Sequence, residues 1–187
     1  MAVELAEAAA AELARVSQQL RARVEAVAPR ARLTWIAADR LHFTIRFLGE
    51  VDDARAAAIT AALAPPLAAA AFDITMTEVG AFPPKGPPRV LWAGVGEGRG
   101  QMVALEREVS ARLASCGVPP EPHSYTPHVT LARVREANRL RTRDVLDAAP
   151  DGVFGVTGVD AITLFQSRLS PNGPTYVALQ RTALGRT

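Results

Sequence analysis

The sequence predicts an α+β fold of two similar lobes, each a mainly antiparallel sheet backed by helices. Two long amphipathic segments, residues 6–27 and 101–116, have the spacing of helices. Shorter runs alternate apolar and polar residues, as strands do. A helix followed by a strand that contains a histidine occurs twice, so we expect one bilobal domain covering residues 1–187.

Each long helix is predicted from one apolar stripe. The first stripe ends before Pro29 and consists of Leu13, Val16, Leu20, Val24 and Val27. The second consists of Met102, Leu105, Val109, Leu113 and Cys116. Steps of three and four positions place these side chains on one helix face, so both stripes should be buried. A shorter helix should begin at Asp52 or Asp53 and end near Leu63, and a weaker one should cover residues 136–148.

The predicted strands are the runs bounded by turn-forming residues. They cover residues 32–37, 41–48, 72–79, 90–95, 128–134, 153–166 and 175–184. A polar turn at Asp39 and Arg40 joins the first two of these strands. Pro-rich loops at residues 82–89 and 119–127 precede the strands that begin at positions 90 and 128.

Composition excludes several classes of protein. No run approaches the roughly 20 apolar residues of a membrane span, and we expect no signal peptide. A single cysteine, Cys116, excludes an internal disulfide, and we expect this residue to be buried and structural. The absence of disulfides favours a cytoplasmic protein. We expect the protein to be a monomer. The formal net charge is +2, with Lys85 as the sole lysine, and does not by itself indicate nucleic-acid binding.

Two strands share a His-x-Thr-x motif in which each x is apolar. One contains His42 and Thr44, and the other contains His128 and Thr130. Because side chains alternate along a strand, each histidine shares a face with its threonine, and the apolar residues take the opposite face. A single motif of this kind is common by chance. Two copies, which use two of only three histidines, favour a function.

The paired motifs suit hydrolysis of a phosphodiester near neutral pH. Water must lose a proton and the leaving oxygen must gain one, and imidazole can perform either step. The threonine hydroxyls can donate hydrogen bonds to the non-bridging oxygens, where negative charge develops.

The remaining candidate residues favour structural interpretations. His123 lies in a Pro-rich loop without a threonine partner, so we expect it at the surface. A metal site built from His123 and His128 is not expected, because no carboxylate lies beside them and Pro127 excludes the helical spacing of ligands. We therefore expect neither a metal nor a cofactor.

These motifs and several further segments resemble the two-histidine (2H) phosphoesterases, most closely their RNA 2′,3′-cyclic phosphodiesterase branch, also called LigT-like or ThpR proteins. The segments that carry the resemblance are residues 41–51, 80–83, 88–92, 127–133 and 164–169. They extend over nearly the whole chain. Members of the family usually open with a full apolar strand, whereas residues 1–5 form a short one here, so we expect a clipped first strand.

The resemblance implies a central cleft across which the two motifs face each other. It implies that His42 and His128 are catalytic, that Thr44 and Thr130 hold the phosphate, that Arg133 binds phosphate and that Phe47 stacks on a base. Strict alternation would turn Arg133 and Phe47 away from the cleft, so each requires a bulge or a strand end.

The implied substrate is RNA, or an oligonucleotide, with a 2′,3′-cyclic phosphate end that is opened to a 2′-phosphate without metal. The reverse reaction, 2′-5′ joining of RNA ends, is also implied. Two alternatives stay open: another two-histidine activity, on 2′-5′ oligonucleotides or cyclic nucleotides, and a module that binds RNA ends without turnover.

Overall fold

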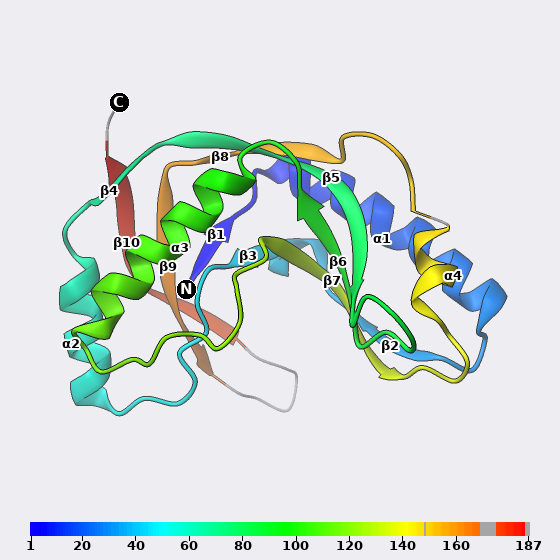
Figure 1. The fold of residues 1–187 in the computed structure, drawn as a ribbon, viewed down its shortest axis with the longest axis horizontal. Helices are drawn as coiled ribbons and strands as arrows, with labels where there is room; N and C mark the ends of the chain where they lie inside the picture. Colours follow the sequence, from blue (N-terminus) through cyan, green and yellow to red (C-terminus); the bar gives the residue numbers. More distant parts are fainter. Residues whose placement is uncertain (148, 169–174, 186–187) are drawn as a thin grey trace.

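The structure, a computed structural model, describes residues 1–147, 149–168 and 175–185. A ten-stranded sheet forms its centre, in the order β4-β10-β9-β1-β3-β7-β6-β5-β8, and β2 also pairs with β7 (Figure 1). The strands are β1 Ala2–Glu4, β2 Arg32–Trp35, β3 His42–Thr44, β4 Leu67–Ala70, β5 Phe72–Phe82, β6 Val90–Val95, β7 His128–Glu136, β8 Gly155–Val159, β9 Ala161–Arg168 and β10 Thr175–Gly185. Every described pair is antiparallel except β4 with β10.

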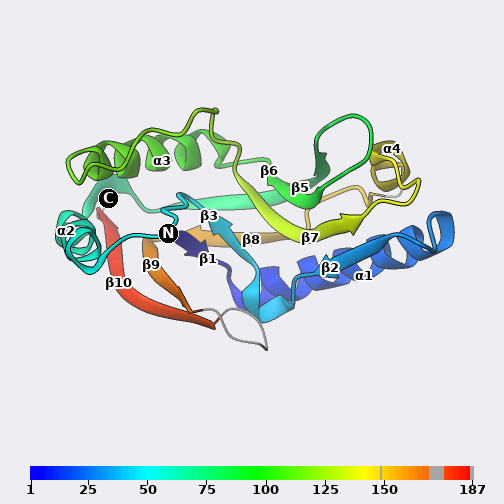
Figure 2. The ribbon, with the colours of Figure 1, turned by 90° about the horizontal axis from the view of Figure 1, so that it is seen from below.

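The helices cover the two ends of this sheet separately. They are α1 Glu7–Val27, α2 Asp53–Leu63, α3 Arg99–Ala114 and α4 Thr142–Leu146, with a 3-10 turn, η1, at Ala38–Arg40. Helices α2 and α3 pack near β4 and β10, whereas α1 and α4 pack on β5, β7 and β8. Figure 2 shows α3 and α1 on opposite sides of the sheet. The predicted α+β architecture, a mainly antiparallel sheet backed by helices, is therefore confirmed, and the strands of the two expected lobes form one continuous sheet.

The two predicted stripes account for most of the helix packing. Leu13 and Leu20 in α1, and all four stripe residues inside α3, are 0% exposed. The last predicted member of each stripe is less buried than expected, although Cys116 still packs against the core. Val27 is 38% exposed at the end of α1, and Cys116 lies beyond α3, half-buried, with its Sγ 3.6 Å from the carbonyl oxygen of Ala58. Helix ends fray, so periodicity is least reliable there.

The two histidine strands meet in the middle of the sheet. We use "His42 half" for β4, β10, β9, β1 and β3, and "His128 half" for β7, β6, β5 and β8 with β2. Helix α1 precedes His42 in the chain but packs on the His128 half. Helix α3 precedes His128 but packs beside β4, in the His42 half. The predicted repeat is thus present along the chain, but each helix supports the half that holds the other histidine.

Four elements differ from the sequence prediction. The strand expected at 41–48 ends at Thr44, and the helix expected at 136–148 is confined to α4, with residue 148 outside the described residues. The strand expected at 153–166 is two strands, because β8 pairs with β5 whereas β9 pairs with β10 in the other half. The short first strand is present as β1, between β3 and β9. Strand β4 was not expected.

None of the described helices is long and apolar enough to cross a membrane.

Candidate active site

Both His-x-Thr-x motifs lie on one face of two adjacent strands. Phe43 of β3 pairs directly with Val129 of β7, and both side chains are 0% exposed. In an antiparallel pair the next residues along this register place His42 across from Thr130, and Thr44 across from His128. Because side chains alternate, all four lie on the face opposite Phe43 and Val129.

The two imidazoles are diagonal neighbours in this arrangement. Diagonal positions on one face of an antiparallel pair are roughly 7–8 Å apart. His42 and His128 are half-buried, Thr130 is half-buried and Thr44 is exposed. The two imidazoles and the two threonine side chains therefore share one partly accessible face, with a threonine across from each histidine.

Both histidines are held in the same tautomer by the same kind of backbone contact. The Nδ1 atom of His42 lies 2.8 Å from the carbonyl oxygen of Arg40, and Nδ1 of His128 lies 2.7 Å from that of Thr126. A carbonyl oxygen can only accept, so each Nδ1 carries the hydrogen and donates it. Each Nε2 is then free to accept a proton when the ring is neutral and to donate one when it is charged.

Burial lowers the pKa of both His42 and His128 below the ordinary value of 6.5. The hydrogen bond to a backbone carbonyl works in the opposite direction in both residues, and the positive charge of Arg133 lowers both pKa values further. Without a ligand, the environment thus favours neutral imidazoles. A negatively charged phosphate between the rings would raise both pKa values.

A bulge in β7 brings Arg133 to the face of the histidines. Trp92 of β6 pairs with Thr130, but the preceding residue, Leu91, pairs with Ala132, so Leu131 is an extra residue in β7. Leu131 and Ala132 are both 0% exposed, because at the bulge two consecutive side chains point to the same, buried face. After the bulge, Arg133 returns to the side of Thr130, with its side chain exposed.

Phe47 reaches the solvent because β3 ends at Thr44, and its side chain is 78% exposed. The residue before it is anchored in the interior. Arg46 is 4% exposed, its Nη2 donates to the carbonyl of Pro119, and its Nη1 lies 3.4 Å from Glu121 and 3.8 Å from Glu106. The loop that presents Phe47 is therefore held by a buried arginine.

Aromatic side chains flank each histidine. The ring of His128 packs edge-on against Phe82 at 5.2 Å between centroids, and Trp92 lies 6.2 Å away. Tyr176 packs edge-on against His42 at 6.1 Å. Gly80 makes the first arrangement possible, because a Cβ there would lie 2.1 Å from the indole of Trp92. These contacts restrict the orientations of both imidazoles.

Sequence analysis missed the roles of Arg46, Phe82, Trp92 and Tyr176. A signal was available for two of them, since Phe82 and Trp92 lie in the segments at 80–83 and 88–92 that resemble the 2H family. Burial of Arg46 and the approach of Tyr176 depend on distant residues and leave no local pattern. Of the segment at 164–169 that resembles the 2H family, residues 164–168 form the last part of β9, and Leu169 lies outside the described residues.

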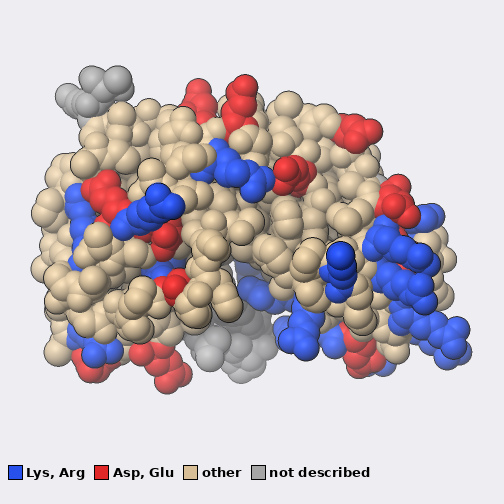
Figure 3. Space-filling model, in the orientation of Figure 1, with Lys and Arg blue, Asp and Glu red and all other residues tan. Residues whose placement is uncertain are grey.

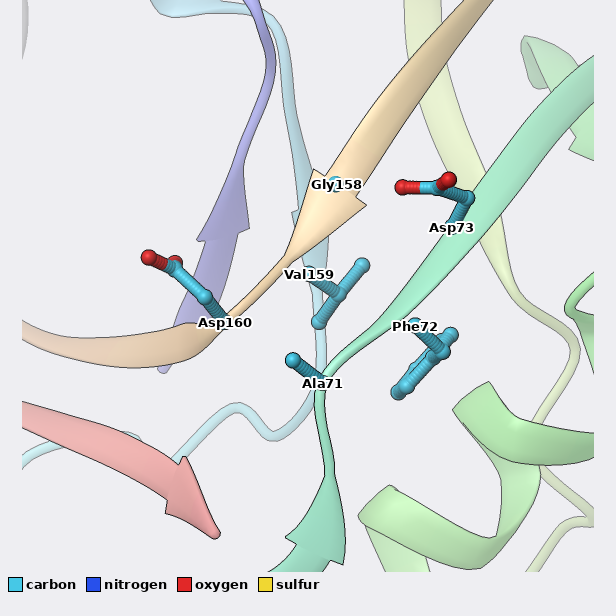
Figure 4. Close-up of a pocket in the computed structure, with 6 residues that line it drawn as sticks. All are labelled: Ala71, Phe72, Asp73, Gly158, Val159 and Asp160. Atoms are coloured by element: carbon cyan, nitrogen blue, oxygen red, sulfur yellow. The ribbon is translucent and has the colours of Figure 1, made fainter. Parts of the chain in front are cut away.

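Other candidate locations lack this chemistry. His123 is exposed, and no group of three or more His, Cys, Asp or Glu side chains within the described ranges is arranged to hold a metal ion. A hollow of about 400 Å³ at the β5–β8 edge is lined by Ala71, Phe72, Asp73, Gly158, Val159 and Asp160 (Figure 4). It contains no histidine, and Asp160 is already paired with Arg181 at 2.9 Å. The histidine face is thus the better candidate.

Comparison with known proteins agrees with this fold. The model of the 2′-5′ RNA ligase superfamily matches residues 5–168, and the chain belongs to that family. Among its relatives, an RNA 2′,3′-cyclic phosphodiesterase of Aeropyrum pernix is 39% identical over 142 residues, which are 75% of this chain and 80% of that protein. A protein of the same name from Aquifex aeolicus is 31% identical over 153 residues, 81% of each chain.

Solved structures show the same fold over nearly the whole chain. The protein TT0787 of Thermus thermophilus has a TM-score of 0.72 at 27% identity, with 98% of this chain and 95% of that one covered. Escherichia coli LigT in complex with 3′-AMP has a TM-score of 0.68 at 22% identity, with 99% and 96% covered. The second match supports the fold alone.

Proposed function

We propose that this protein hydrolyses the terminal 2′,3′-cyclic phosphate of RNA to a 2′-phosphate, with His42 and His128 as the acid–base pair. The observation that carries the proposal is the diagonal placement of two imidazoles, each with Nδ1 bonded to a backbone carbonyl and Nε2 free. The names of the relatives, RNA 2′,3′-cyclic phosphodiesterase, supply the substrate class.

The reaction needs two proton transfers on opposite sides of phosphorus. In the proposed mechanism the neutral ring of His128 accepts a proton from water as the water oxygen attacks phosphorus. The charged ring of His42 gives a proton to O3′ as the bond from phosphorus to O3′ breaks. A 2′-phosphate and a free 3′-hydroxyl result. Both transfers are assigned to side chains of this chain, in line with general acid–base catalysis.

The neighbouring residues are assigned to binding. Thr44 and Thr130 would donate hydrogen bonds to the non-bridging oxygens, which gain negative charge in the transition state. Arg133, whose charge already acts on both imidazoles, would hold the phosphate. Phe47, exposed in the loop after β3, would stack on the terminal base.

The direct test is incubation of the protein with an oligoribonucleotide that ends in a 2′,3′-cyclic phosphate, followed by identification of the product. We expect a 2′-phosphate, with the same rate in EDTA. A 3′-phosphate would contradict the direction of opening, and loss of turnover in EDTA that a divalent ion restores would contradict a metal-free mechanism. Parallel incubation with 2′-5′ dinucleotides and with cyclic mononucleotides separates the other two-histidine activities.

Joining of RNA ends through a 2′-5′ linkage is a second candidate, because the family is described as the 2′-5′ RNA ligase superfamily. A 2′,3′-cyclic phosphate end and a 5′-hydroxyl end would be joined if the hydroxyl took the place of water. Detection of a 2′-5′ linkage at high RNA concentration would support this activity, and it should require the same two histidines.

A further inference from the structure

Basic residues are concentrated in one part of this nearly neutral chain. Residues 130–143 contain five arginines and one acidic residue, and the loop at 83–89 adds Lys85 and Arg89 with no acidic residue. The formal net charge of the whole chain is only +2. Figure 3 shows Lys and Arg side chains gathered at the end of the molecule that carries β2 and α4. The positive charge is therefore concentrated at this end of the molecule, although the chain as a whole carries little net charge.

The fold brings these two segments together beside the histidine face. Val90 pairs with Arg133, and the amide of Val134 donates to the carbonyl of Arg89 at 2.8 Å. The amide of Thr142 donates to the carbonyl of Gly86 at 3.0 Å, which ties the loop at 83–89 to the start of α4. The loop at 83–89 therefore lies beside the second half of β7 and the residues that follow it.

Two of these arginines continue the line of the motif along β7. Thr34 of β2 pairs with Arg133, so it lies on the same face, and the Nε of Arg135 donates to the Thr34 hydroxyl at 3.3 Å. Arg135 lies at a second bulge of β7, because Arg32 of β2 pairs with Glu136 whereas Leu33 pairs with Val134. Its hydrogen bond to Thr34 brings its side chain to the side of Arg133. At a strand rise of about 3.3 Å per residue, Arg135 lies roughly 20 Å from His128.

These basic groups are not neutralised by the protein. Among described residues, no carboxylate oxygen lies within 4.0 Å of the charged nitrogens of Lys85, Arg133, Arg135 or Arg139, all of which are exposed. By contrast, Arg112 in the His42 half is paired with Glu108 at 2.9 Å, and Arg99 is paired with Glu78 at 2.7 Å. A group of cations without carboxylate partners complements a ligand that carries several negative charges.

We propose that Arg135, Arg139 and Lys85, which we call the β7 basic track, bind the phosphates of the RNA strand on the 5′ side of the terminal cyclic phosphate. The inference rests on the proposed function, which places the cyclic phosphate between the histidines. That phosphate is the 3′ end of its strand, so the rest of the RNA continues only in the 5′ direction. Arg133 is the first cation along β7 beyond the motif, and Arg135 follows it in the same strand. Arg139 lies in the turn after β7, and Lys85 lies in the loop that Gly86 joins to Thr142. The occupant is single-stranded RNA, held through its phosphates.

The test compares a long substrate with a minimal one. Substrates are a 2′,3′-cyclic mononucleotide and an oligoribonucleotide of about ten nucleotides that ends in the same cyclic nucleotide. Arg135→Ala combined with Arg139→Ala should lower kcat/KM for the oligonucleotide about tenfold or more, because charge-assisted contacts to phosphate are lost. Turnover of the mononucleotide should not change. The matched control is Arg107→Ala, an exposed arginine on α3, which should affect neither substrate.

A binding measurement keeps the test independent of turnover. Fluorescence anisotropy with a ten-nucleotide RNA that already carries a 2′-phosphate should show weaker binding to the double variant. The slope of log K against log salt should decrease by about 0.7 for each phosphate contact removed. Unchanged melting temperatures would show that both variants fold.

The outcomes separate the two proposals. If wild-type protein hydrolyses neither substrate, the proposed function fails, and anisotropy still decides whether the track binds RNA. Equal loss of turnover on the mononucleotide and the oligonucleotide would overturn the track, because the arginines would then act on the reacting end. An unchanged salt slope and unchanged oligonucleotide turnover in the double variant would also overturn it.

Discussion

Phe43 lies directly across from Val129, and this one pair joins β3 to β7 within the described part of the chain. Both side chains are fully buried at 0% exposure. Because side chains alternate along a strand, burial of this pair turns the neighbouring histidines and threonines to the opposite, accessible face. Burial of the apolar residue inside each His-x-Thr-x motif therefore determines which face the histidine and the threonine occupy.

Replacement of either His42 or His128 by alanine should lower turnover of the cyclic-phosphate end by roughly 10² to 10⁴-fold, the usual contribution of one general acid or base. Folding should be little affected, since both rings are only half-buried on an accessible face. His123→Ala is the matched control and should retain wild-type turnover, because that residue is exposed in a loop. A near-wild-type rate in either of the first two variants would refute the paired-histidine mechanism.

The pH dependence of kcat/KM should be a bell with its maximum on the acidic side of pH 6.5. The rate falls in acid as the base gains a proton, and falls in alkali as the acid loses one. Burial and Arg133 lower the pKa of both imidazoles in the free protein, so both limbs of the profile move to lower pH. Because the two histidines interact, each limb reports an apparent pKa of the pair and not of one residue. The kcat profile, measured with phosphate bound, should lie at higher pH. A rate that rises continuously into alkali would contradict this scheme.

Arg133→Lys should weaken substrate binding or turnover although the charge is retained, because an ammonium lacks the planar fork of a guanidinium. Steady-state kinetics with the oligonucleotide measures this effect. Burial is the main cause of the lowered pKa of both histidines, and the charge of Arg133 adds to it, so Arg133→Gln should also move the kcat/KM bell to higher pH. If the lysine variant behaves as wild type, Arg133 does not hold the phosphate.

The division of roles between the histidines can be tested by changing the leaving group. In a cyclic substrate with sulfur at the bridging 3′ position, the thiolate departs without a proton, because thiols are far more acidic than alcohols. Loss of the acid, His42, should then reduce turnover much less than loss of the base, His128. Equal reductions on the sulfur substrate would overturn this assignment, and a reversed order would exchange the two roles.

Arg46→Ala should destabilise the fold by about 3–5 kcal/mol, because it leaves the largely buried carboxylate of Glu106 without its cation. Chemical denaturation measures the free energy of unfolding. The control is Arg15→Ala, whose ion pair with Glu12 at 2.6 Å is exposed and should contribute no more than about 1 kcal/mol. A loss below that of the control would show that Arg46 is not a structural anchor of the Phe47 loop.

The sequence alone determined the elements whose signal is local. The stripe in α1 and the stripe in α3 each bury one helix face, and the spacing of their apolar residues already indicates that face. Val90–Val95 was recognisable as a short, continuous apolar run bounded by turn residues, and most of it is buried in β6. The two motifs were recognisable for the same reason, because an apolar residue between a histidine and a threonine already separates two faces of a strand.

Only the tertiary structure decided how these elements meet. The bulge at Leu131 exists because β7 pairs with β6 on one side, and it alone returns Arg133 to the histidine face. Arg46 is buried because Glu106, Pro119 and Glu121 approach it from elsewhere in the chain. Which half each helix supports was likewise set by packing between distant residues. Spacing along a chain records which face of an element is apolar, but pairing register and charge burial depend on partners that no local pattern contains.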